Sequence, residues 1–175
     1  TDGSRESQAR SLWLGVAVDA NCIYVIDLNV VHRVQVFNRA TFAYVGQFGS
    51  SGSGNGQFNF FWYPGIAVDD DYIYVVDDGN HRIQKFNKST YAYVDQFGTY
   101  GTGNGEFDAP IGIAVDSDYI YVADSNNLRI QKFNKSTYAY VDQFGTDGDG
   151  DGEFHIPYGI AVDAYNVYVC DPENW

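Results

Sequence analysis

The chain has 175 residues and a formal net charge of −13, with 10 Lys and Arg against 23 Asp and Glu. This balance opposes nucleic-acid binding, because contacts with phosphate need a basic face. It also disfavours an anionic membrane surface, and no apolar run approaches the ~18 residues of a membrane-spanning helix. Hydrophobic residues at 45% and aromatic residues at 17% are enough to build a core and exclude a disordered tail.

One five-residue pattern, Gly followed by Val or Ile and then Ala-Val-Asp, occurs four times. The copies begin at Gly15, Gly65, Gly112 and Gly159, with spacings of 50, 47 and 47 residues. A fixed period in this range is typical of propellers, solenoids and repeat arrays. No window of useful length has a 3.6-residue hydrophobic period, so we expect almost no helix.

Each unit contains four short segments, which we call strands a to d. Strand a is the Gly-Ile-Ala-Val-Asp segment itself, and strand b is Ile-Tyr-Val-x-Asp, as at 73–77. Strand c alternates polar and apolar residues, as at 82–86, and strand d follows a short turn, as at 91–97. Four such strands joined by tight turns predict an antiparallel meander. Strand a has the smallest residues and is expected beside the axis of a β-propeller.

The predicted fold is therefore an all-β propeller with three full blades and one partial blade. The units are a degenerate linker at 1–14, blades at 15–61, 62–108 and 109–155, and the partial blade at 156–175.

These segments resemble NHL repeats. The resemblance rests on Gly-Ile-Ala-Val-Asp, on Ile-Tyr-Val-Ala-Asp, on Asn80-His81-Arg82-Ile83-Gln84 and on the glycine-rich linker from Phe97 to Phe107. It covers nearly the whole chain and implies a propeller, usually of six blades in this family. Family members bind proteins or RNA, act as scaffolds or, in a few cases, are lyases, so the resemblance does not select a function.

The final unit ends within the turn that precedes strand c, because residues 171–175 align with 77–81. Three interpretations follow: a window from a longer repeat chain, a chain whose edge another subunit covers in a ring or filament, or a small four-bladed ring with a defective last blade. Strand b of this unit would then be an exposed edge for assembly. Its residues are Val167, Tyr168, Val169 and Cys170.

The last linker is acidic and contains the pattern Asp-x-Asp-x-Asp-Gly. Alternate carboxylates on a tight turn match the first half of a calcium-binding loop. The candidate ligands are Asp147, Asp149, Asp151 and Glu153, although the bidentate Glu expected at loop position 12 is replaced by Tyr158. The alternative is an ordinary glycine-rich linker that became acidic.

Asp residues close strands a and b in every unit, and an Arg opens strand c in the first three. Recurrence favours a structural role over acid–base catalysis: we expect each Asp to accept N–H bonds from the turn that follows, and each Arg to pair with a blade Asp. His32 and His81 share a position that holds Leu128 in the next copy, which indicates a packing site.

Two Asn-Lys-Ser sequences, at Asn87 and Asn134, match the N-glycosylation pattern and lie on the predicted c–d turns. The first unit has Asn38-Arg-Ala40 instead and lacks the acceptor.

The expected function is a secreted or cell-surface structural or interaction module, with a protein partner or self-association through the incomplete blade. No catalytic cluster stands out, so an enzyme is not expected. The alternative is a fragment of a propeller lyase or hydrolase whose catalytic residues lie outside these units.

Overall fold

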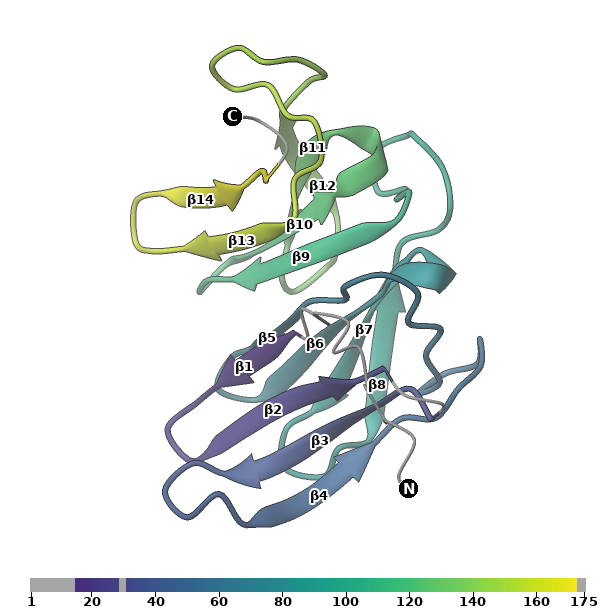
Figure 1. The fold of residues 1–175 in the computed structure, drawn as a ribbon, viewed down its shortest axis with the longest axis vertical. Helices are drawn as coiled ribbons and strands as arrows, with labels where there is room; N and C mark the ends of the chain where they lie inside the picture. Colours follow the sequence, from purple (N-terminus) through teal and green to yellow (C-terminus); the bar gives the residue numbers. More distant parts are fainter. Residues whose placement is uncertain (1–14, 29–30, 173–175) are drawn as a thin grey trace, which may run out of the picture.

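The computed structural model describes residues 15–28 and 31–172. Its strands form three four-stranded antiparallel sheets and one two-stranded sheet, and strands consecutive in the chain are neighbours in each sheet. This confirms the all-β prediction. The sheets follow one another as blades along an open arc (Figure 1). Within the described residues, no helix is long and apolar enough to cross a membrane.

The blades repeat the same order of elements. The first contains β1 (Val16–Val18), β2 (Cys22–Asp27), β3 (Arg33–Asn38) and β4 (Tyr44–Phe48). The second contains β5 (Ile66–Val68), β6 (Tyr72–Asp77), the 3-10 helix η1 (Asp78–Asn80), β7 (Arg82–Asn87) and β8 (Tyr93–Phe97). The third contains β9 (Pro110–Val115), β10 (Tyr119–Asp124), the 3-10 helix η2 (Ser125–Asn127), β11 (Arg129–Asn134) and β12 (Tyr140–Phe144). The partial blade contains β13 (Gly159–Val162) and β14 (Val167–Cys170).

Each strand alternates between the two faces of its blade, and both faces are apolar in the middle of the arc. In β6, Ile73 and Val75 face the first blade, whereas Tyr74 and Val76 face the third. All four side chains are fully buried. A pleated strand places successive residues on opposite faces, so an apolar run here means that the blade is covered on both sides.

The hydrophobic core consequently lies between successive blades and is divided into three clusters. The cluster between the first two blades joins Tyr24 and Phe48 to Phe86, with Phe58 of the linker inserted among them. Phe107 occupies the corresponding place in the next cluster, and Phe154 in the last. The linker phenylalanine therefore belongs to the core and ties each blade to the one before it.

The innermost strands approach so closely that a glycine is required where they meet. The N–H of Gly65 donates to the carbonyl of Ile111 at 2.8 Å, which joins the second blade to the third. A Cβ atom on Gly65 would lie 2.6 Å from that carbonyl oxygen and 3.1 Å from the backbone nitrogen of Ile113, and backbone atoms cannot move aside easily.

The substitution Gly65→Ala is expected to destabilise the protein by about 1–3 kcal/mol, because the added methyl overpacks two inner strands. Gly159→Ala is a matched control: Gly159 occupies the same repeat position, but its Cβ would meet only Cys170 Cβ, at 3.4 Å. We expect the control to stay within about 0.5 kcal/mol of the unsubstituted protein. Urea unfolding measures both, and equal losses would contradict the close-approach argument.

Candidate functional site

A buried Asp–Arg–Gln group in the second and third blades holds the preceding linker. In the second blade Arg82 Nε donates to Asp77 Oδ2 at 2.7 Å, and Gln84 Nε2 donates to the same oxygen at 3.0 Å. Arg82 Nη2 then reaches the linker carbonyls of Gly54, at 2.8 Å, and Gln57, at 3.0 Å. The predicted ion pair of strand-c Arg with a blade Asp is thus confirmed, and its further role is to clamp the linker.

The clamp recurs in the third blade, and the Asp–Arg pair is also seen in the first, whose preceding linker lies outside the described residues. Arg129 pairs with Asp124 at 2.8 Å in the third blade, where only 8% of the arginine side chain is exposed. In the first blade Arg33 pairs with Asp27 at 2.9 Å, and 28% of the arginine side chain is exposed.

The recurring Asp residues divide into two roles. At the end of strand a, Asp69 accepts the N–H groups of Asp71 and Tyr72 and the hydroxyl of Tyr74, as predicted for a tight turn. Burial opposes ionisation of Asp69, but these hydrogen bonds outweigh it and lower its pKa. At the end of strand b the backbone donor differs from the prediction: Asp77 accepts the backbone N–H of Asn59 in the linker, and from the turn that follows it accepts the side-chain N–H of Asn80.

The shared histidine position is more than a packing site. His32 Nδ1 accepts the N–H of Phe60 at 2.9 Å, and His81 Nδ1 accepts the N–H of Ala109 at 3.2 Å. Each ring therefore fixes the linker of the following blade. Leu128 adopts the same left-handed backbone conformation, with φ of 56°, but its side chain has no hydrogen-bond acceptor.

The predicted calcium loop does not gather its four carboxylates around one point. Glu153 folds back and accepts the N–H of Gly150 at 2.8 Å, while Asp149 contacts His155 Nε2 at 2.8 Å. Asp147 lies 3.7 Å from the other ring nitrogen of His155. The hydrogen bond to Asp149 raises the pKa of His155.

The same turn closure occurs in the other linkers, where Glu106 accepts the N–H of Gly103 and Gln57 that of Gly54. Among the described residues no three His, Cys, Asp or Glu side chains are placed to hold a metal ion. Calcium binding at Asp147, Asp149, Asp151 and Glu153 stays a prediction from the sequence.

Both candidate glycosylation residues sit in tight c–d turns. Asn87 Oδ1 accepts the N–H groups of Ser89 and Thr90, and Asn134 does the same in the next blade. Asn38 makes an equivalent turn without an acceptor sequence. The turn therefore accounts for the asparagine, and it leaves Nδ2, the atom that carries an N-linked glycan, outside these bonds.

The predicted assembly edge lies at one end of the arc. β14 pairs with β13, and no described strand pairs with its other side. Val167 and Val169 pack against the third blade, whereas Tyr168 is 54% exposed on the opposite face together with Cys170. We call Ala161, Tyr168 and Cys170 the trailing face.

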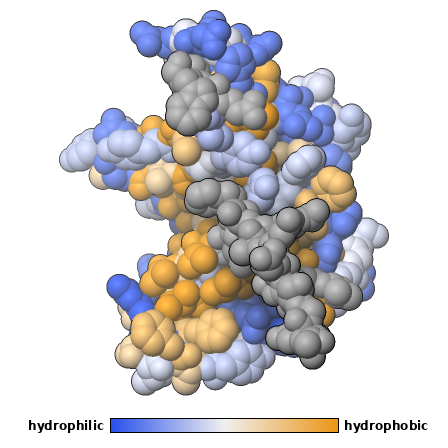
Figure 2. Space-filling view, viewed as in Figure 1, coloured by the Kyte–Doolittle hydropathy of each residue, from blue (hydrophilic) through white to orange (hydrophobic). Residues whose placement is uncertain are grey.

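The other end of the arc also presents an apolar face. Val16 and Val18 are 54% and 48% exposed, and the register places Ile23 and Val25 opposite them on β2. Figure 2 shows apolar side chains gathered over β1 and β2. We call Val16, Val18, Ile23, Val25 and Phe37 the leading face.

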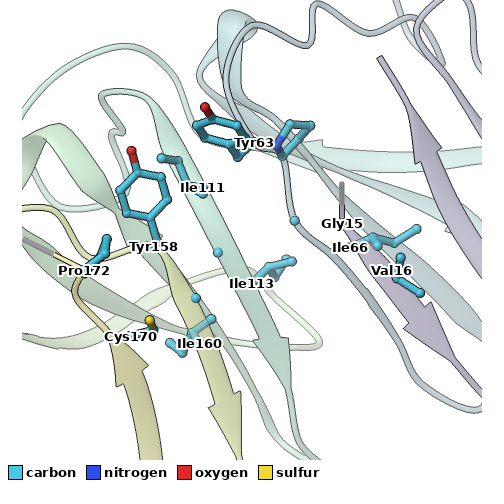
Figure 3. A pocket seen from close by; sticks show the side chains of 14 residues that line it. Gly15, Val16, Tyr63, Ile66, Ile111, Ile113, Tyr158, Ile160, Cys170 and Pro172 are labelled. Atoms are coloured by element: carbon cyan, nitrogen blue, oxygen red, sulfur yellow. The ribbon is translucent and has the colours of Figure 1, made fainter. Parts of the chain in front are cut away.

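A groove of about 930 Å³ runs along the innermost strands. The axial groove, as we call it, is lined largely by Gly, Ile and Pro, and the rings of Tyr63 and Tyr158 lie at one end with their centroids 5.9 Å apart. Figure 3 shows the two rings side by side, with both hydroxyl groups pointing the same way.

Sequence reasoning missed these tyrosines because it compared the segments that repeat. The signal was the pair of residues before each strand-a glycine, because the strand itself is nearly constant whereas this pair varies. It reads Trp13-Leu14, Tyr63-Pro64, Pro110-Ile111 and Pro157-Tyr158.

The NHL repeat model matches residues 63–86 and 107–133. A comparison with curated protein sequences found no match. Solved structures with a similar fold include a streptogramin B lyase, at a TM-score of 0.66 and 13% identity over 92% of this chain and 48% of that one. A glutaminyl cyclase of Myxococcus xanthus has a TM-score of 0.60 and 12% identity, over 89% and 66% of the two chains.

The computationally designed Ika4 protein has a TM-score of 0.58 and 9% identity over 92% of this chain and 86% of its own. At such identities the likeness shows the fold alone. The chain spans about half of the lyase and two thirds of the cyclase, so their activities do not carry over.

Asp77→Asn is expected to lower the free energy of unfolding by about 3–5 kcal/mol, because it leaves the buried Arg82 without its counter-charge. Asp171→Asn is the control: Asp171 accepts the N–H groups of His155 and Ile156, and no arginine pairs with it in the described part of the chain. Losing one charge-assisted acceptor there costs about 1.5–3 kcal/mol at most. Similar losses in urea unfolding would contradict the clamp.

Proposed function

Because this chain carries NHL repeats that fold as blades of a β-propeller, we propose that it is a structural and interaction module that associates blade on blade through the two ends of its arc. The observation that carries this proposal is the chemical match between the trailing face and the leading face.

The trailing face repeats the surface by which every full blade contacts the next. Ala161, Tyr168 and Cys170 correspond in the repeat to Ala67, Tyr74 and Val76, which are 7%, 0% and 0% exposed between the second and third blades.

The leading face repeats the surface that receives a preceding blade. Val16 and Val18 correspond to Ile66 and Val68, and Ile23, Val25 and Phe37 correspond to Ile73, Val75 and Phe86. The last three are at most 1% exposed, packed against the first blade. Exposed apolar patches of this kind mark association surfaces.

The two faces differ, so the contact that they support is head-to-tail. Repetition of a head-to-tail contact gives a closed ring or an open filament. A second copy offers both faces, and further repeats of the same kind in one polypeptide would offer the same surfaces.

A secreted or cell-surface location is part of this proposal. It is supported by the two sequons, whose asparagines sit in turns that leave Nδ2 outside the turn bonds. Expression through a eukaryotic secretory pathway is expected to yield glycans at Asn87 and Asn134, detected by peptide mass mapping before and after deglycosylation. Asn38, in the equivalent turn of the first blade but without an acceptor sequence, serves as the internal control. Unmodified sequons in the secreted protein would count against this location.

Tyr168→Asp and Val18→Asp are each expected to weaken self-association by about tenfold or more, because each places a charge in the apolar contact. Sedimentation velocity over a concentration series measures the effect. Tyr165→Asp is the matched control, since Tyr165 lies in the same hairpin and is 93% exposed but belongs to neither face.

Mixing the two variants tests the polarity of the contact. A Tyr168→Asp chain keeps its leading face and a Val18→Asp chain keeps its trailing face, so the mixture is expected to form dimers that neither variant forms alone. A monomeric unsubstituted chain throughout the series, or no association in the mixture, would overturn the proposal.

A further inference from the structure

The second blade carries an aromatic insertion that its neighbours lack. Between the linker phenylalanine and the strand-a glycine this blade has residues 59–64, whereas the next has only 108–111 and the last only 155–158. The inserted segment is almost wholly aromatic: Phe60, Phe61, Trp62 and Tyr63.

A dedicated carboxylate fixes the insertion. Asp78 is 1% exposed and accepts the N–H of Phe61, at 3.1 Å, and the N–H of Trp62. The corresponding residues of the other units are Leu28, Ser125 and Pro172, so the carboxylate and the insertion occur in the same blade. Burial raises the pKa of Asp78, and this effect outweighs the hydrogen bonds, which lower it.

Buried ring contacts of Phe60 also hold the inserted loop in place. Phe60 is buried and stacks on Phe58, with ring centroids 4.6 Å apart, and on His32, at 5.7 Å. Phe61 and Trp62 nevertheless remain 71% and 50% exposed. A fixed backbone that presents large rings to solvent gives contact area at little cost in conformational entropy, as in the anchor residues of binding surfaces.

The exposed rings are adjacent in the chain to Tyr63, which lines the axial groove. Trp62 precedes Tyr63, whose ring lies beside that of Tyr158 at the end of the groove (Figure 3). We call Phe61, Trp62, Tyr63 and Tyr158 the aromatic platform. The groove beyond it is lined by Ile111, Gly112 and other residues without charged side chains.

We propose that the aromatic platform and the axial groove bind a proline-rich segment of another protein, flanked by Lys or Arg. Ring faces at one end of a groove that is otherwise lined by Gly, Ile and Pro, with the Tyr63 hydroxyl as donor, suit a ligand that is apolar but rich in carbonyl acceptors. A polyproline II segment is such a ligand, because it has no internal hydrogen bonds and docks in aromatic-lined grooves. A sugar or phosphate ligand would require more polar or charged groups than the lining supplies.

Charge and composition restrict the partner further. The net charge of −13 attracts basic flanks and favours their approach. A second copy of this chain does not supply the segment, since its 4 prolines are widely separated, at Pro64, Pro110, Pro157 and Pro172. The platform itself shares no residue with the leading or trailing face, whereas the groove beyond it is bordered by Val16 of the first and Cys170 of the second.

The test is fluorescence anisotropy of a labelled arginine-flanked polyproline peptide titrated with the full chain. We expect saturable binding that Trp62→Ala weakens by about tenfold or more, as for an anchor residue. Tyr63→Phe keeps the ring and removes the donor, so a smaller loss is expected. Tyr165→Ala, at an exposed tyrosine far from the groove lining, is expected to bind as the unsubstituted chain does. Circular dichroism verifies that each variant is folded.

A peptide with the same arginines but alanine in place of proline separates shape from charge. We expect its binding to be at least about tenfold weaker. Equal binding of both peptides would overturn the proposal in favour of simple electrostatic attraction, and no binding of either would overturn it outright. If Trp62→Ala instead alters sedimentation and leaves peptide binding unchanged, the platform is a contact between copies and the proposal is wrong.

Discussion

A single blade has two apolar faces, and this constraint shapes the rest of the molecule. A lone four-stranded sheet cannot bury both faces, so the core forms between sheets, with Tyr24 and Ile73 on opposite sides of the first contact. Stacked repeats of this kind contact only their neighbours. An interior blade is therefore covered on both sides, and the first and last blades each keep one face with exposed apolar side chains, such as Val16 and Tyr168.

The linkers turn a stack of sheets into a continuous structure. Each described linker inserts a phenylalanine such as Phe58 into the core, and the linkers before the second and third blades are also bound by the Arg and Gln of the following blade. The buried charge of Arg82 is tolerated because Asp77 neutralises it and backbone carbonyls take the remaining donors. The same residues that look like a surface ion pair in the sequence thus connect two blades.

The fold could be predicted because its information is local and repeated. The period, the strand alternation and the Asp–Arg pairs all follow from spacing within one unit. The histidine contact was missed because the partner of His32 is a backbone N–H of Phe60 in the following linker. Asp78 was missed because Asp-Gly-Asn is an ordinary turn sequence. Its role as acceptor for the N–H groups of Phe61 and Trp62 becomes visible only in the folded structure. Features that occur in only one blade become apparent only in the folded structure, because a comparison of the repeats finds what the repeats share.

The division of the core among blades also sets how stability is distributed. Nine or more residues are buried in each of the first two clusters, but only four, including Tyr121 and Ile130, in the cluster beneath the partial blade. Local opening is easiest where few apolar groups are buried. The β13–β14 hairpin is therefore expected to open more readily than the full blades, so the trailing face, which we propose as an association surface, lies on the element most able to change shape when a neighbour binds.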